Sequence, residues 1–237
     1  MPSNYNTIII NQPFGMGDIV FIQSIANDFV DEGYKLIMPV EDIYASLNKH
    51  FPNVTIVDRN FIAIDYNNRN DYVLNGVRVI PMRFSDSICG VPYTACMKSK
   101  YFLLQKDWTK WKDNCKIVRD TNAENKLFYD VLKLNDGEPY NLISQQFTTG
   151  GARTLPITVN NGLRNVELSF VNGFTHIDWL KVYQNATNIH AVSSSNIYLF
   201  ELFDLSAKEV HLYIRRPHEK NHDNYKYILT KNYILHN

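Results

Sequence analysis

A glycine-rich turn near the start of the chain carries a carboxylate that could take part in catalysis. The turn follows an apolar run at Thr7–Ile10 and leads into a helical pattern of apolar residues. Helix N-terminal amides attract anions, so a turn of this kind often binds phosphate. Here the dinucleotide pattern Gly-x-Gly-x-x-Gly is broken at Val20, and Asp18 would repel a pyrophosphate. We therefore expect the turn to hold a carboxylate near a substrate. Its residues are Gly15, Met16, Gly17 and Asp18.

A structural role for the same carboxylate is the alternative. Aspartate is favourable at the N-cap of a helix, and Asp18 stands close to a predicted helix start. Residue type alone does not decide between a capping role and a catalytic one, so both interpretations stay open.

A second group of polar residues follows two predicted strands in the second half of the chain. The strands are Tyr140–Ser144 and Ile189–Val192. In a doubly wound sheet, ligands bind beyond the carboxyl ends of the strands, so both loops should lie at one edge. Hydroxyls and free amides there predict a site for a nucleotide diphosphate. The alternative is that the serines only cap a helix and Gly150 and Gly151 only form a turn. The candidate ligands are Gln145, Thr148, Thr149, Ser193, Ser194 and Ser195.

Two arginines follow the predicted strand Val210–Ile214. A guanidinium at the end of a strand suits a phosphate or a carboxylate, and we assign Arg215 to the same diphosphate site. A solvated surface pair is the alternative, and it is at least as good for Arg216.

The segment Lys98–Lys126 is basic, although the whole chain has 24 basic and 24 acidic side chains. The segment itself has 8 basic and 4 acidic residues, together with Trp108 and Trp111. Aromatic and basic side chains together can bind nucleic acid, including duplex DNA. An amphipathic linker that packs on two domains is the alternative, and we favour it.

The order of the elements predicts an α/β fold. Strand and helix patterns alternate as βαβαβ within the first ~60 residues, which is typical of a parallel sheet. One of these helices, Glu41–Phe51, should bury Ile43, Leu47 and Phe51. A helix capped by Asn122 or Thr121 should bury Leu127, Phe128, Val131 and Leu132. A turn-rich break at residues 133–139 then precedes a second series of strands and helices.

We therefore predict two Rossmann-like domains that face a cleft. The first is an acceptor-side domain, residues 1–120, with a basic linker segment at 98–138. The second, residues 139–237, should bind the donor.

Several classes of protein are disfavoured. The balanced net charge argues against binding nucleic acid by bulk charge. Three scattered cysteines give neither a disulfide framework nor zinc spacing, and we find no Asp-x-Asp motif, so we expect no bound metal. No apolar run approaches the ~18–20 residues of a membrane span. We expect a cytoplasmic protein, in the host cytoplasm if it is viral.

Two stretches resemble glycosyltransferases of the GT-B fold. The stretch PFGMGDIVFIQSI is similar to the N-terminal loop of the heptosyltransferase-like branch, where Gly-(small)-Gly-Asp precedes a helix. The stretch DWLKVYQNATNIHAVSSSNIYLFELFDL resembles the late helix–strand–helix of the same enzymes, whose serine-rich turn holds the donor diphosphate. Together the two patches cover about a third of the chain, in the order that this fold requires. The chain is short for the family, which leaves open how the nucleotide base and ribose are enclosed.

The resemblance implies an inverting hexosyl- or pentosyltransferase that works without metal or cofactor. Asp18 would be the general base, and Ser193–Ser195 would hold the diphosphate of a nucleotide sugar such as a UDP-sugar. The acceptor would be a glycan or, since the AT-rich composition hints at a phage, a hydroxymethylated base (5-hydroxymethylcytosine) in DNA. A non-catalytic nucleotide- or glycan-binding module on the same scaffold is the alternative, because fold does not fix function.

Overall fold

The chain folds into two compact units, Met1–Val118 and Arg119–Asn237, in the computed structural model. The structure describes residues 5–11, 15–68, 70–82, 96–147, 152–215 and 226–236. The division falls between Val118 and Arg119, before the turn at residues 133–139. The predicted linker segment, residues 98–138, is therefore divided between the two units. Its second part belongs to the second unit, where Arg119 Nη1 donates to Gln184 Oε1 at 2.6 Å and Lys181 Nζ donates to Tyr129 Oη at 2.7 Å.

The first unit is built on a five-stranded sheet in the order β3-β2-β1-β5-β4. Four strands are parallel, and β4 pairs antiparallel to β5 through a turn at Asn75 and Gly76. Both turn residues have positive φ, as a tight hairpin requires. The strands are β1 (Thr7–Asn11), β2 (Lys35–Val40), β3 (Val54–Asp58), β4 (Tyr72–Leu74) and β5 (Val77–Pro81).

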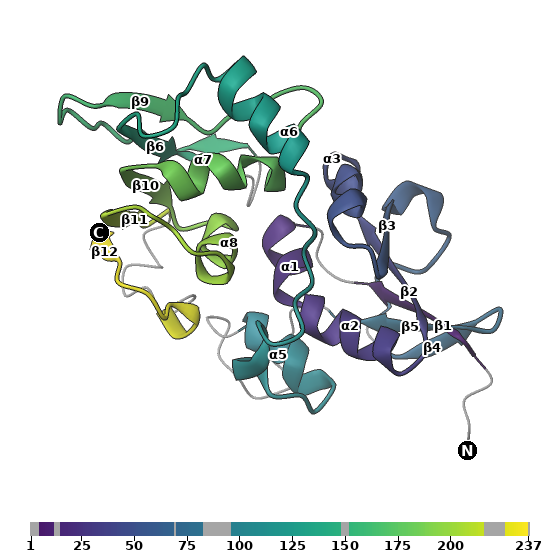
Figure 1. The fold of residues 1–237 in the computed structure, drawn as a ribbon. Coiled ribbons are helices and arrows are strands. Elements are labelled where there is room, and N and C mark those ends of the chain that lie inside the picture. Colours follow the sequence, from purple (N-terminus) through teal and green to yellow (C-terminus); the bar gives the residue numbers. More distant parts are fainter. Residues whose placement is uncertain are drawn as a thin grey trace. The chain divides into compact units, whose positions relative to one another are not determined.

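Short helices connect these strands, and α5 lies beside α1 and α2 in Figure 1. The predicted first helix is confirmed, but Ile22 interrupts it and separates α1 from α2. The helices are α1 (Met16–Phe21), α2 (Gln23–Asp31), α3 (Asp42–Ala45) and α5 (Cys96–Leu103), with 3-10 turns η1 (Ser46–His50), η2 (Arg59–Phe61) and η4 (Trp108–Lys110).

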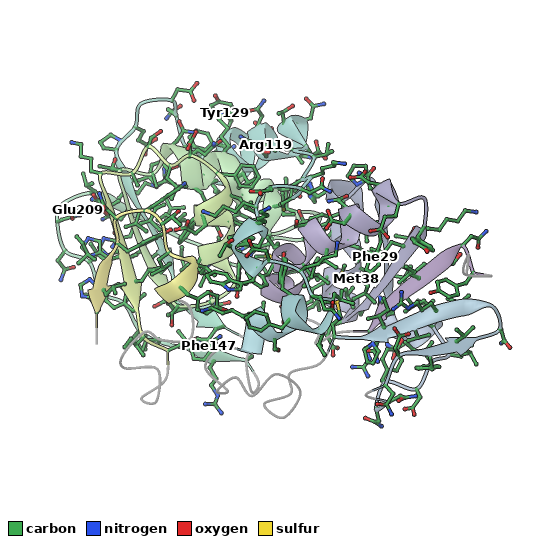
Figure 2. The ribbon with its side chains drawn as sticks, turned by 90° about the horizontal axis from the view of Figure 1, so that it is seen from below. Phe29, Met38, Arg119, Tyr129, Phe147 and Glu209 are labelled. Atoms are coloured by element: carbon green, nitrogen blue, oxygen red, sulfur yellow. The ribbon has the colours of Figure 1, made fainter. Side chains whose placement is uncertain are left out.

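The core of the first unit is formed by apolar side chains from β1, β2 and the α1–α2 pair. Phe29 and Met38 lie in this interior (Figure 2). Leu47 and Phe51 are buried as predicted, but Ile43 is 66% exposed. The expected single helix is in fact α3 followed by the tighter η1, which changes the angular spacing between side chains and turns Ile43 to the surface.

The second unit is built on a five-stranded, fully parallel sheet in the order β12-β11-β10-β6-β9. A two-stranded hairpin of β7 (Gln146–Phe147) and β8 (Arg153–Thr154) follows β6. The sheet strands are β6 (Tyr140–Ser144), β9 (Arg164–Glu167), β10 (Asn188–Val192), β11 (Glu209–Tyr213) and β12 (Ile234–His236). The helices are α6 (Thr121–Asn125), α7 (Leu180–Asn185) and α8 (Asn196–Leu202), with the π-helical turn η5 (Lys126–Val131) and 3-10 turns η6 (Ile177–Trp179) and η8 (Lys226–Ile228).

The helix that opens the second unit differs from the prediction in two respects. Its N-cap is Asp120, whose side chain accepts from Ala123 N at 3.0 Å, and not Thr121 or Asn122. The π-helical turn η5 adds one residue per turn, so the buried positions shift along the chain. Val131 is therefore 42% exposed and Leu134 is buried.

Two histidines of the second unit should make its stability depend on pH. Burial lowers the pKa of His176 to about 4. Burial, followed by the nearby His211 and His236, lowers the pKa of His190 to about 4. Both values lie below the ordinary histidine pKa of about 6.5. The unfolded chain therefore binds protons below about pH 6.5, while the folded unit does not until about pH 4.

We expect the second unit to lose stability as the pH falls through this window, on the order of 2 kcal/mol per histidine between about pH 7 and about pH 5. Urea unfolding at the two pH values measures the loss. His190→Phe, which removes one of the two groups, should recover part of it. Equal stability at both pH values would contradict the expectation.

Candidate functional site

The glycine-rich turn of the first unit leaves β1 at the topological switch point of the sheet. The chain runs from β1 to β2 and β3 on one side, and β5 then pairs with the other side of β1. The crevice beyond the carboxyl ends of two such strands is where open α/β sheets bind ligands. The turn at residues 15–18 begins four residues after Asn11, the last residue of β1, so Asp18 follows the strand end where this fold favours a site.

Asp18 is the third residue of α1, and it is not the cap. The N-cap is Gly15, whose carbonyl oxygen accepts from Asp18 N at 3.0 Å and from Ile19 N at 3.1 Å. The Asp18 side chain is not that of the N-cap residue, and its Oδ1 is paired with the ammonium of Lys100 from α5. The capping alternative is therefore wrong for this residue. Met16 and Gly17 are buried and form the first helical turn.

Lys100 is a site residue that the sequence did not single out. Its side chain is 0% exposed, while that of Asp18 is 15% exposed. Lys100 lies in the basic segment, 82 residues from Asp18, and no local pattern joins the two positions. The ion pair could be found only after α5 had been placed against α1.

Asn11 is a second residue that the sequence analysis missed. It ends β1, its side chain is fully buried, and neither its Nδ2 nor its Oδ1 has a hydrogen-bond partner in the described part of the chain. Its backbone oxygen accepts from Met82 N at 2.7 Å and so joins β1 to the end of β5. Such an amide, with no partner among the described residues, is unusual at a switch point, because buried polar groups are normally bonded.

Several cations of the basic segment pair with acids of the first unit. Lys106 Nζ pairs with Asp28 Oδ2 at 2.5 Å, and Lys116 Nζ pairs with Asp31 Oδ1 at 3.3 Å. Asn114 and Lys116 donate to Asp31 and lower the pKa of its carboxyl. The acidic face of α2 thus takes up positive charge that a nucleic-acid surface would need.

The tryptophans of the segment pack in the same way. Trp111 is buried, with its ring centroid 5.3 Å from that of Phe21. Trp108 is half-buried and lies under Lys98 Nζ, 4.4 Å from the ring centroid. In the described residues before Arg119, the segment packs against α1 and α2, and Trp111 belongs to the core of the first unit.

The serine-rich turn of the second unit also lies at a switch point. β6 pairs with β9 on one side and with β10 on the other, so the carboxyl ends of β6 and β10 are neighbours. Ser144 ends β6, and Ser193 follows β10 directly. The loop after β6 and the loop after β10 therefore begin side by side at the carboxyl end of the sheet, as predicted.

The three serines differ in their surroundings. Ser193 is buried, and its Oγ accepts from Arg215 N at 3.3 Å, which fastens the end of β10 to the residues after β11. Ser194 and Ser195 are half-buried at the start of α8, and Ser195 makes no side-chain capping bond although it is the N-cap. The capping alternative therefore fails for the Ser195 hydroxyl.

The other predicted donor ligands have varied placements. The two ends of the Gln145 side chain are occupied: Nε2 donates to Glu167 Oε1 at 2.8 Å, and Oε1 accepts from Ile157 N at 3.2 Å. Gln145 therefore braces the loop after β6. Arg215 is half-buried beside Ser193, at the carboxyl end of β11. Thr148, Thr149, Gly150, Gly151 and Arg216 lie outside the described residues.

A polar network behind the serine turn was missed. Asn196 Nδ2 donates to Ser144 Oγ at 2.6 Å, and Asn196 Oδ1 contacts His176 Nε2. Tyr183 Oη lies 2.9 Å from the same nitrogen. Burial lowers the pKa of His176 to about 4, so the ring is neutral at physiological pH. The network joins Ser144, at the end of β6, to Asn196, which starts α8 directly after Ser194 and Ser195. Asn196 directly follows the three serines at the start of a predicted helix. Its polar side chain at that position was the one sequence feature that could have indicated the network.

The described residues hold neither a cluster of metal-binding side chains nor a long apolar helix. Within them, no group of three or more histidine, cysteine, aspartate or glutamate side chains is arranged to hold a metal ion. None of the helices described has the length and apolar character needed to cross a membrane.

Comparison with known proteins relates the chain to a fold. Neither a protein-family model nor a curated protein matches the sequence. Among solved structures, it is similar to the bacterial iron-containing dodecameric glycosyltransferase TibC from enterotoxigenic E. coli H10407, with a TM-score of 0.51 and 12% identity. The match covers 89% of this chain and 58% of that one, so this chain spans little more than half the length of TibC. The chain has an α/β fold with parallel sheets, of the Rossmann-like kind found in a glycosyltransferase, and the predicted α/β class with a Rossmann-like sheet in each unit is confirmed.

Proposed function

We propose that this chain is a glycosyltransferase that moves a sugar from a nucleotide sugar to an acceptor hydroxyl. The observation that carries the proposal is the position of Asp18 at the switch point of the first sheet, with its carboxylate partly open to solvent. The glycosyltransferase fold of the structural neighbour supports it. Asp18 would act as the general base and remove the proton from the acceptor hydroxyl as that oxygen attacks the anomeric carbon.

The second unit would bind the donor. Ser194 and Ser195 would donate their hydroxyls to the diphosphate, with Arg215 adding positive charge at the same edge of the sheet. Ser193 and Gln145 would act through the loops that they brace, because their polar side-chain atoms already have partners. A single displacement by the acceptor would invert the anomeric centre, as in the heptosyltransferase-like branch that the sequence resembles. In this proposal, neither donor binding nor the displacement at the anomeric carbon uses a metal or a cofactor. A UDP-sugar is the co-substrate that we would try first.

The donor site can be tested by binding alone. The double variant Ser194→Ala/Ser195→Ala should weaken the binding of UDP about tenfold or more, since each lost hydrogen bond to a charged phosphate is worth about 1.5–3 kcal/mol. Calorimetric titration with UDP and other nucleoside diphosphates provides the measurement. Ser206→Ala, in the loop between α8 and β11, is a matched control and should bind normally. Unchanged affinity in the double variant would remove Ser194 and Ser195 from the donor site.

The acceptor is proposed to be a glycan. A hydroxymethylated base in phage DNA was motivated by the basic segment, but Lys100, Lys106 and Lys116 are paired with acids of α1 and α2. We therefore expect weak binding to duplex DNA. Titrations between about 50 and 200 mM salt distinguish the two acceptors, because phosphate contacts give affinities that fall steeply with salt. Tight binding with a steep slope would favour DNA.

A further inference from the structure

The Lys100–Asp18 ion pair joins a fully buried ammonium to a carboxylate that is partly open. Lys100 comes from α5 and Asp18 from α1. A lysine is rarely buried completely, because its charge then loses hydration, and it requires a charged or hydrogen-bonding partner. Burying the Lys100 ammonium therefore costs hydration free energy whatever the pair does. A role in positioning Asp18 would explain why the chain bears this cost.

Neighbouring contacts hold α5 in the register that this pair needs. Tyr101 Oη donates to the carbonyl oxygen of Phe21 at 2.6 Å, at the end of α1. The rings of Phe21 and Tyr101 also meet edge to face, with centroids 5.1 Å apart. Since Tyr101 is the residue after Lys100, the Nζ of Lys100 cannot shift along α1 without breaking these contacts.

The two oxygens of Asp18 have different surroundings. Oδ1 is taken by Lys100. Oδ2 lies over Gly15, and a Cβ added at Gly15 would come within 3.2 Å of it. That is closer than ordinary van der Waals contact. Gly15 has φ −76° and ψ 155°, a conformation open to any residue, so backbone strain does not explain the glycine. Among the described residues other than its chain neighbours, Asp18 Oδ2 is the one atom within 4 Å of that added Cβ, so the absence of a side chain there leaves space beside Oδ2.

We propose that Lys100 is a positioning residue for the transfer reaction: it holds Oδ1 so that Oδ2 faces the space above Gly15, where the acceptor hydroxyl is bound. This inference rests on the proposed function. In the step itself, the acceptor oxygen forms a bond to the anomeric carbon while the bond from that carbon to the diphosphate oxygen breaks. The acceptor proton moves to Asp18 Oδ2, and the bonding electron pair leaves with the nucleoside diphosphate. Lys100 keeps its protons throughout.

The experiment compares two lysines of the basic segment. Lys100→Met keeps the length of the side chain but removes the charge, and it should lower kcat by at least about a hundredfold, because misplaced catalytic groups cost about that much. The Kd for UDP should stay within about twofold of the wild-type value, since the proposed donor site is on the second unit. Lys106→Met is the matched control: it breaks a similar pair with Asp28 and should keep kcat within about threefold.

A second variant tests the same inference if Lys100→Met does not fold. Gly15→Ala keeps an allowed backbone and places a methyl group beside Oδ2, so it should lower kcat about tenfold or more with normal thermal unfolding. Normal kcat in a folded Lys100→Met would overturn the positioning role, as would normal kcat in Gly15→Ala if Lys100→Met does not fold. A folded wild-type chain that transfers no sugar from any nucleotide sugar would instead overturn the proposed function itself, so the two failures can be told apart.

Discussion

Replacing Asp18 with asparagine is expected to lower kcat for sugar transfer by about a thousandfold, the scale of a lost general base. An amide has the volume of the carboxylate, and its oxygen can still accept from Lys100, so the fold should persist. The asparagine amide is too weak a base to accept the proton of the acceptor hydroxyl, so the transfer loses its general base. The measurement is the steady-state rate of transfer, with the Kd for UDP measured alongside.

The matched control for this variant is Asp28→Asn, which neutralises an acid of α2 that pairs with Lys106 outside the glycine-rich turn. It should keep the wild-type rate. Asp18→Ala is a poorer test, because removing one partner of a buried ion pair costs about 3–5 kcal/mol and would mix lost stability with lost catalysis. Transfer by Asp18→Asn at the wild-type rate would rule out Asp18 as the base.

The second large effect is expected at Trp111. Trp111→Ala should lower the free energy of unfolding of the first unit by about 3–5 kcal/mol, because it leaves a cavity beside Phe21. Trp108→Ala removes a half-buried ring that contacts Lys98, and it should cost less than about 2 kcal/mol. Urea unfolding of the two variants measures the difference.

The comparison also separates the two interpretations of the aromatic, basic segment. If Trp111 were part of a nucleic-acid surface, its replacement would weaken DNA binding and leave stability unchanged. We expect the opposite: a large loss of stability and no specific loss of binding.

Local patterns predicted the elements that carry the proposed site. The apolar run before the glycine turn became β1, and the run before Ser193–Ser195 became β10. Each pattern needs only a few consecutive residues, because alternation and burial are properties of one segment. The rule that ligands bind at strand ends then placed both loops correctly at the edges of their sheets.

The predictions that were wrong or incomplete depend on packing and helix geometry, which a local sequence pattern does not reveal. Val131 was expected to be buried because a regular helix was assumed, and the π-helical turn η5 shifts the register by one residue. Lys100 looked like one more surface cation in a basic run, and only the packing of α5 reveals its burial. β12 has three residues, two of them exposed, which is too short for alternation to be recognised.

The most direct test of the account is acceptor-dependent transfer from a panel of nucleotide sugars. The wild-type chain is incubated with each donor and a set of glycan acceptors, and mass spectrometry records the sugar added to the acceptor and the nucleoside diphosphate released. We predict that at least one donor gives equal amounts of the two products, and that Asp18→Asn forms both about a thousandfold more slowly while still binding UDP. UDP binding by the wild type without any turnover would contradict the account and favour a non-catalytic binding module.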